Sequence, residues 1–164
     1  PSLIRFPKGS VPEAIPALRV EGDVDILSED GRPDAVCDLL VVGIGSMVAT
    51  AQEVADKLRA DGVSVRVVDP RWVLPVSSHL VSLGAHATAV AVIEDNVVGS
   101  GVGAAISHAM SASQSPHHPV WCFGVRQEFL DHGSRAQVLE RVGLTPDSIA
   151  TTLISRLGNQ TRSL

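Results

Sequence analysis

Two adjacent carboxylates, Glu94 and Asp95, are the side chains best placed in this sequence for acid–base or binding chemistry. They follow the apolar run 89–93, whose β-branched residues predict a buried strand. Three glycines at alternate positions come next: Gly99, Gly101 and Gly103. Glycine lets backbone approach backbone closely, and a helix that begins here would present free N–H groups. Because open α/β sheets bind ligands at the carboxyl ends of their strands, this turn is the first candidate site.

The two carboxylates have three possible roles. Neighbouring side chains on a strand point to opposite faces, so we do not expect Glu94 and Asp95 to share one proton. Acid–base chemistry by one of them is the first role. Capping of the helix that begins near Gly101 is the second, and pairing with a basic group across an interface is the third. We favour the two structural roles.

A second glycine turn, at Gly43 and Gly45, follows the predicted strand 37–43. A dinucleotide-binding turn begins in the same way, and Asp69 ends the next strand, where an acid would contact a ribose. Val48 replaces the third glycine of that motif, so the helix would not close around a pyrophosphate in the usual way. We expect a structural turn and keep nucleotide binding as an alternative.

Two cations near the start of the chain, Arg5 and Lys8, flank a phenylalanine and a rigid proline. Arginine binds phosphate through two parallel hydrogen bonds, whereas lysine acts as a point charge. These residues therefore form either a phosphate site or an exposed basic linker.

The six histidines do not form a metal-binding pattern, because none is spaced with Cys, Asp or Glu like a ligand set. His132 lies just before the predicted helix 134–141. It either faces a site or bonds to the backbone of its own turn, and we favour the turn.

Alternating strands and helices must position these residues. Strands are predicted at 17–20, 24–27, 37–43, 63–69, 89–93 and 120–124, and helices at 47–60, 77–83, 101–112, 134–141 and 146–157. Ser46, Ser77, Ser134 and Thr145 are candidate N-caps. The alternation predicts a three-layer α/β fold, with a mostly parallel sheet of about five strands and helices on both faces. The early hairpin supplies one antiparallel edge strand.

The composition is that of a globular domain. The chain has 164 residues, of which 45 % are hydrophobic and 19 % charged, and its net charge is −5. This acidic balance argues against a general affinity for nucleic acid or anionic membranes, and no apolar run reaches the roughly 18 residues of a membrane span. Cys37 and Cys122 lie in or beside apolar strands. They fit buried free thiols in a reducing cytosol, so we expect a cytoplasmic protein.

The chain divides into three parts. Residues 1–15 are interpreted as a linker from a preceding domain, residues 16–158 as the domain itself, and residues 159–164 as a frayed tail. The domain offers no nucleophile–base pair, no P-loop and no metal-ligand pattern, so its residues predict no complete active site. We therefore expect one part of a larger catalyst.

Five segments, taken in order, carry a resemblance. They are IRFPKG at 4–9, VGIGS at 42–46, VDPRWVLP at 68–75, the acidic pair and glycines at 93–103, and the loop 124–133 with Phe129 and His132. Together they resemble the C-terminal domain of the 1-deoxy-D-xylulose-5-phosphate synthase family over nearly the whole chain. Transketolases and the beta subunits of 2-oxo acid dehydrogenases share this architecture.

Two positions depart from the family pattern. Arg126-Gln127 stands where Pro-Asp is common, and Lys8 stands where arginine is also found. The first change affects the geometry of the loop. The second keeps the positive charge but loses bidentate phosphate binding.

The resemblance implies an enzyme that condenses pyruvate with D-glyceraldehyde 3-phosphate and releases carbon dioxide, for isoprenoid and thiamine biosynthesis. It implies thiamine diphosphate and Mg²⁺, held by the preceding domains and not by this chain. By position, Lys8 would help to hold the acceptor phosphate, with Arg5 beside it.

The remaining candidates would have supporting roles, at an interface or in structural turns: Glu94, Asp95, Gly99, Gly101, Gly103 and His132. We expect a homodimer and no activity from the chain alone. The alternatives are the C-terminal part of a transketolase or dehydrogenase beta subunit, and a free-standing assembly module of the same fold.

Overall fold

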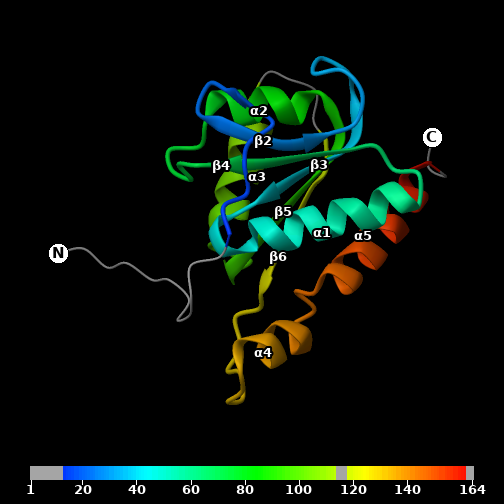
Figure 1. Ribbon diagram of the computed structural model, residues 1–164. Coiled ribbons are helices and arrows are strands. Elements are labelled where there is room, and N and C mark those ends of the chain that lie inside the picture. The colour runs from blue at the N-terminus through cyan, green and yellow to red at the C-terminus, as the bar shows by residue number, and fades with distance from the viewer. Residues whose placement is uncertain (1–12, 114–117, 162–164) are drawn as a thin grey trace.

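The computed structural model describes residues 13–113 and 118–161, so Arg5 and Lys8 lie outside the described residues. The strands are β1 (Arg19–Glu21), β2 (Val24–Glu29), β3 (Cys37–Gly43), β4 (Val65–Pro70), β5 (Ala87–Val97) and β6 (Val120–Val125). The helices are the 3₁₀ turn η1 (Gly45–Met47), α1 (Val48–Ala60), α2 (Ser78–Ala85), α3 (Val102–Ala112), α4 (Arg135–Arg141) and α5 (Pro146–Thr161). Their arrangement is shown in Figure 1.

Within the described residues, six strands form one sheet in the order β1-β2-β4-β3-β5-β6. The four strands β4, β3, β5 and β6 are parallel, whereas β2 joins β4 in the antiparallel sense and β1 pairs with β2. The predicted α/β class and the antiparallel edge are confirmed. The sheet has one strand more than the expected five, because both strands of the early hairpin join it.

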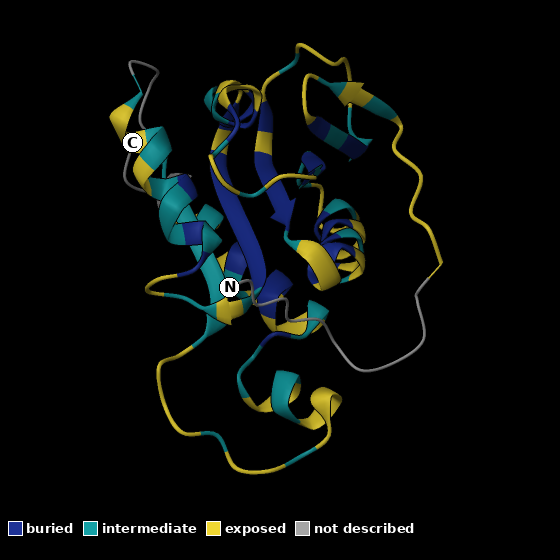
Figure 2. Ribbon diagram, turned by 90° about the vertical axis from the view of Figure 1, so that its left-hand side faces the viewer, coloured by how far each residue is buried: buried dark blue, intermediate teal, exposed yellow. Residues whose placement is uncertain are grey.

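Each face of the sheet carries its own apolar core, as alternation along a doubly covered strand requires. On β3, Leu39 and Val41 contact the core under α1 and α5, while Leu40 and Val42 contact the core under α2 and α3. Figure 2 shows the central strands as the most buried part of the molecule. The sheet is thus a rigid frame whose carboxyl edge carries the candidate residues.

Three of the four predicted helix caps are present. At the start of α5, the Thr145 hydroxyl accepts a hydrogen bond from the backbone N–H of Ser148 (3.4 Å). Ser77 accepts hydrogen bonds from the backbone N–H groups of His79 and Leu80, and Ser134 forms a capping box with Gln137. The prediction for Ser46 is wrong, because η1 precedes α1 and the N-cap position falls on Met47. Helix α5 continues to Thr161, beyond the predicted end at residue 157.

A buried ion network fixes the antiparallel strand β2 on β4. Glu29 accepts hydrogen bonds from the guanidinium groups of Arg19 (2.9 Å) and Arg66 (3.0 Å). Arg66 also donates to the carbonyl oxygen of Pro33 at 2.7 Å. Hydrogen bonding to Arg19 lowers the pKa of Glu29 below its usual 4.5, so this carboxylate is ionised at neutral pH.

No helix in the described ranges is long and apolar enough to cross a membrane.

Candidate functional site

Glu94 is a buried carboxylate that caps a helix. Its side chain accepts hydrogen bonds from the backbone N–H groups of Val102 (2.8 Å) and Gly103 (2.9 Å), at the start of α3. The residue is only 1 % exposed. An ionised carboxylate at this end of a helix interacts favourably with the helix dipole. Both oxygens of Glu94 are therefore engaged in holding α3, which is the capping role we favour for one of the two carboxylates.

The acidic pair lies at a bulge in β5. The pairing of β5 with β6 shifts register between Ile93 and Val97, so residues 94–96 form an irregular stretch opposite β6. Gly124 makes room for this stretch, because a Cβ there would lie 2.6 Å from the carbonyl oxygen of Asn96. Strand β5 runs to Val97, so the acidic pair lies within the strand and not after it.

Two of the three alternating glycines are required by the cap. A Cβ on Gly101 would collide with the Glu94 carboxylate, and one on Gly103 would lie 2.9 Å from the Cys122 sulfur. Gly99 has no atom within 4 Å of its Cβ position. Close approach therefore explains Gly101 and Gly103, and it does not explain Gly99.

Asp95 points away from this cap and forms an ion pair. Its carboxylate lies 2.9 Å from the guanidinium of Arg135, the first residue of α4. The same guanidinium nitrogen donates to the Ser46 hydroxyl at 3.2 Å. Arg135 thus joins α4 to the turn η1 after β3 and to the last residues of β5. The basic partner expected for one carboxylate lies in the same chain.

Cys122 lies beside the cap and is unsuited to nucleophilic attack. Burial, and then the charge of Glu94, raise the pKa of its thiol above the usual 9.0. The reactive form of cysteine is the thiolate, so this group stays protonated at neutral pH. Burial also raises the pKa of Cys37. Both thiols are free, as predicted, but only Cys37 is buried, whereas Cys122 is partly exposed.

His132 and Phe129 are exposed in the segment between β6 and α4. Trp72 and Leu74 are exposed in the loop after β4. Since β4 and β6 are parallel, their carboxyl ends lie at the same edge of the sheet. That edge therefore presents large apolar side chains to solvent, which is typical of an interaction surface.

The glycine turn after β3 has a structural explanation. A Cβ on Gly43 would lie 2.8 Å from the Cα of Val48, so the glycine allows close contact between β3 and α1. Asp69 lies opposite Asp25 of β2, and burial together with Asp25 raises its pKa. Its neighbour on this side is the antiparallel strand β2. This geometry favours the structural turn over nucleotide binding.

Sequence reasoning missed a polar cluster of Asp23, Ser77 and His79. Ser77 donates to the Asp23 carboxylate, and the Nδ1 atom of His79 lies 3.3 Å from the same oxygen. This hydrogen bond from Ser77 lowers the pKa of Asp23. Both partners face the carboxylate, so the cluster joins the hairpin turn to α2 and is not a nucleophile–base pair. No local sequence signal reveals it, because the partners are 54 residues apart.

Among the described residues, no group of three or more His, Cys, Asp or Glu side chains could hold a metal ion. The site consists of a buried helix cap at Glu94 and a partly exposed ion pair between Asp95 and Arg135.

Comparison with known proteins assigns this α/β domain to a family. The family model described as transketolase, C-terminal domain, matches residues 32–149, and the chain belongs to this family. The chain is 42 % identical over 166 residues to the 1-deoxy-D-xylulose-5-phosphate synthase of Mycobacteroides abscessus. It is 44 % identical over 166 residues to that of Mycolicibacterium vanbaalenii. These alignments cover 100 % and 98 % of this chain but 25 % of each relative, so the chain spans about a quarter of their length.

Solved structures agree in fold. A split gene transketolase, solved as an inactive beta4 tetramer, superposes with a TM-score of 0.72 and 29 % identity. That match covers 90 % of this chain and 46 % of the other. A transketolase from Campylobacter jejuni gives a TM-score of 0.57 at 20 % identity, covering 81 % of this chain and 18 % of the other, which shows a likeness of fold alone.

Proposed function

We propose that this chain is the C-terminal domain of a cytoplasmic, thiamine diphosphate-dependent 1-deoxy-D-xylulose-5-phosphate synthase. The whole enzyme would join pyruvate to D-glyceraldehyde 3-phosphate with loss of carbon dioxide, for isoprenoid and thiamine biosynthesis. One observation supports the proposal most directly. Two 1-deoxy-D-xylulose-5-phosphate synthases are 42 % and 44 % identical to the chain over nearly its whole length.

The cofactor belongs to the rest of this enzyme in our proposal. Thiamine diphosphate, bound through Mg²⁺, supplies a carbanion-stabilising group. The described residues offer no ligand set for such a metal ion, so we assign no reaction step to them.

The described domain would support its neighbours and a homodimer. The capped turn at Glu94 and the Asp95–Arg135 ion pair hold the loops at the carboxyl edge in fixed positions. Trp72 and Phe129 are exposed at that edge, and we propose that the preceding domains or the second subunit cover them. By itself the chain would be inactive.

Lys8 and Arg5 would contact the substrate of the whole enzyme. The alignment with the M. abscessus synthase covers all of this chain and therefore includes both residues. We propose that Lys8 binds the phosphate of the aldehyde substrate and that Arg5 assists it, because a fixed cation is the usual partner of a phosphate group.

We expect Lys8→Ala in the full-length enzyme to raise the KM for D-glyceraldehyde 3-phosphate about 10- to 100-fold and to change kcat less. A charged contact to a phosphate that takes no part in bond breaking stabilises ground and transition states alike. Steady-state kinetics with varied aldehyde and saturating pyruvate measure both constants.

The matched control for this substitution is Lys57→Ala, which removes a surface lysine that pairs with Asp147 at 2.6 Å. An unchanged KM in Lys8→Ala would remove this residue from the substrate site. Product formation by the purified 164-residue chain with both substrates, thiamine diphosphate and Mg²⁺ would contradict its supporting role.

A second candidate is a part of a transketolase whose catalytic regions lie on separate chains. The solved split gene transketolase favours it, because this chain covers 46 % of that structure. An assay of the parent protein decides between the two. Activity with pyruvate supports the synthase, and transfer between a ketose phosphate and an aldose phosphate supports the transketolase.

A further inference from the structure

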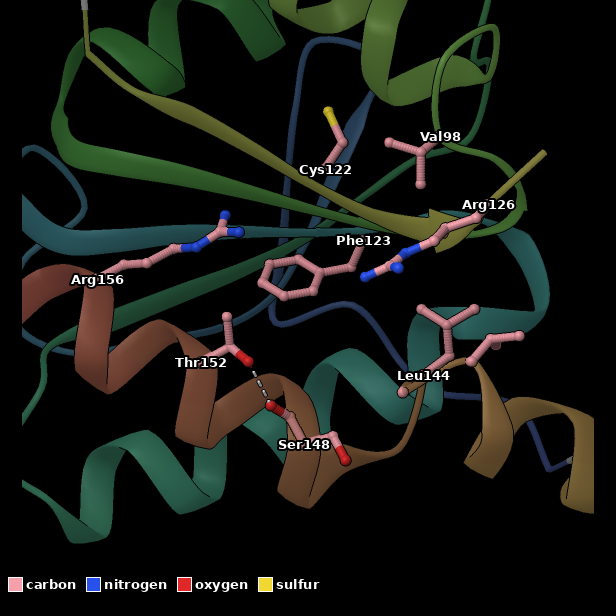
Figure 3. Close-up of a pocket in the computed structure, with 11 residues that line it drawn as sticks. Val98, Cys122, Phe123, Arg126, Leu144, Ser148, Thr152 and Arg156 are labelled. Carbon is pink, nitrogen blue, oxygen red and sulfur yellow. Dashed lines mark hydrogen bonds between the residues drawn. The ribbon is translucent and has the colours of Figure 1, made fainter. Parts of the chain in front are cut away.

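A surface cavity of about 380 Å³ lies along the outer strand β6, between that strand, α5 and the α4–α5 connection. This volume is within the range of small-molecule sites. Figure 3 shows the ring of Phe123 inside the cavity, with the side chains of Arg126 and Arg156 approaching from either side and helix α5 along one wall. The cavity lies apart from Lys8 in sequence and is not used by the proposed function.

The cavity is positively charged in an acidic chain. Its lining includes two arginines and no aspartate or glutamate, whereas the net charge of the whole chain is −5. Among the described residues, neither Arg126 nor Arg156 has a carboxylate partner within 4.0 Å. The other arginines that form ion pairs at this end of the molecule, Arg135 and Arg141, do not line the cavity.

The exposed guanidinium of Arg156 lies over two aromatic rings of β6. Its guanidinium carbon lies 5.6 Å from the ring centre of Trp121 and 5.5 Å from that of Phe123. A guanidinium stacked on aromatic faces keeps its N–H groups free at its rim, in the fork that matches an oxyanion.

The first two turns of α5 form one wall of the cavity. Ser148, the third residue of this 16-residue helix, lines the cavity, and Thr152 follows one turn later. The N–H of Ser148 is already bonded to the Thr145 hydroxyl, and Asp147 lies in the same turn. The two arginines, and not the end of the helix, therefore supply the positive charge of the cavity. Val98, Phe123 and Leu144 contribute apolar groups to the lining of the cavity.

We propose that this cavity binds a small molecule that carries one oxyanion group, phosphate or carboxylate, on a flat apolar body. The oxyanion bonds to Arg126 and Arg156, and the flat body packs on the ring of Phe123. A molecule of this class is a regulatory or accessory ligand, because the cavity has no catalytic residues of its own among those described.

The test is a titration of the ¹⁵N-labelled 164-residue chain, followed by amide chemical shifts. Phenyl phosphate and benzoate carry the same aromatic ring, so comparing them shows whether the cavity prefers phosphate or carboxylate. Inorganic phosphate lacks the ring, so it tests the contribution of the flat apolar body. We expect saturable shifts of Gly124 and Gly143, which line the cavity, and none of Gly62, in the turn after α1. At least one of the two aromatic probes binds more tightly than inorganic phosphate.

Three variants make the titration specific. Arg126→Gln weakens binding about tenfold or more, since one charge-assisted fork is lost. Arg156→Lys keeps the positive charge but loses the fork, and it also weakens binding. Arg141→Gln is the matched control, because Arg141 is an exposed arginine of α4 outside the cavity, and it leaves the affinity unchanged.

Thermal unfolding of each variant confirms that it is folded before it is titrated. Equal affinity in Arg126→Gln and Arg141→Gln, or shifts spread evenly over the chain, would overturn the site. Equal affinity for inorganic phosphate and both aromatic probes would overturn the part assigned to Phe123. Kinetics of Lys8→Ala do not bear on any of these results.

Discussion

At the scale of single residues, the acidic pair shows how one strand position separates two roles. Glu94 points toward α3 and is buried against two backbone N–H groups, while Asp95 points to the opposite side and pairs with Arg135. The period of a strand explains this divergence. The sequence therefore excluded a shared proton, but it did not say which carboxylate would cap the helix.

Gly101→Ala is expected to lower the free energy of unfolding by about 1–3 kcal/mol, because the new methyl group collides with the buried Glu94 carboxylate. Gly99→Ala is the matched control, since nothing lies within 4 Å of its Cβ position, and it changes stability by about 0.5 kcal/mol or less. Urea unfolding followed by circular dichroism measures both. Equal effects of the two substitutions would show that Glu94 does not require the glycine.

At the scale of elements, the antiparallel pairing of β2 with β4 involves charged residues from three different strands. Glu29 is in β2, whereas Arg19 is in β1 and Arg66 is in β4. Strand pairing alone aligns these residues, so the network follows from the topology and not from local sequence. Removing one partner of a buried ion pair is costly because the other charge remains buried.

Glu29→Gln is expected to destabilise the chain by about 3–5 kcal/mol at neutral pH, because Glu29 is 6 % exposed and binds two guanidinium groups. The pKa of Glu29 is lowered in the folded state, so its contribution is present above its usual 4.5 and is lost as the pH falls through the folded-state value. The difference between wild type and variant should therefore shrink in acid. Denaturant unfolding from pH 7 to pH 3 measures it.

The control for this pH series is Glu53→Gln, which neutralises an exposed carboxylate of α1. Its effect should stay small at every pH, as for most surface charges. A difference for Glu29→Gln that stays constant down to pH 3 would contradict the ionic account of β2 pairing.

At the scale of the whole molecule, the described domain has a well-packed sheet and a less buried projection. Figures 1 and 2 show α4 and the segment before it extending away from the sheet, and α4 contains no buried residue. Phe129 lies in that segment and is fully exposed. An element with so little packing of its own is expected to gain contacts in a larger assembly.

Phe129→Ala should leave the melting temperature of the 164-residue chain unchanged, because the exposed ring is not buried on folding. In the full-length parent the same substitution should lower the melting temperature, since we propose that a neighbouring domain or subunit covers this edge. Calorimetry of both proteins compares the two effects, with Gly99→Ala as a neutral control. An unchanged parent would argue against a covered Phe129.

Much of the fold followed from local patterns. The strands from Cys37 to Val125 and helices α1 to α5 were predictable, because buried strands and amphipathic helices have distinct periods. The caps at Ser77 and Ser134 were also predictable. The cap expected at Ser46 is absent, because a 3₁₀ turn that begins at Gly45, a residue with positive φ, precedes α1. The candidate turn was found through its acidic pair and glycines.

The sequence by itself determined the α/β class, the family and the carboxyl edge as the place of the candidate residues, because these depend on residue order and spacing. Only the tertiary structure decided that Glu94 caps α3, that Asp95 anchors α4 and that Arg126 and Arg156 line one cavity. The reason is physical: each arrangement brings together residues from different segments of the chain. Their proximity depends on sheet order, crossover connections and a bulge, and none of these has a local signature.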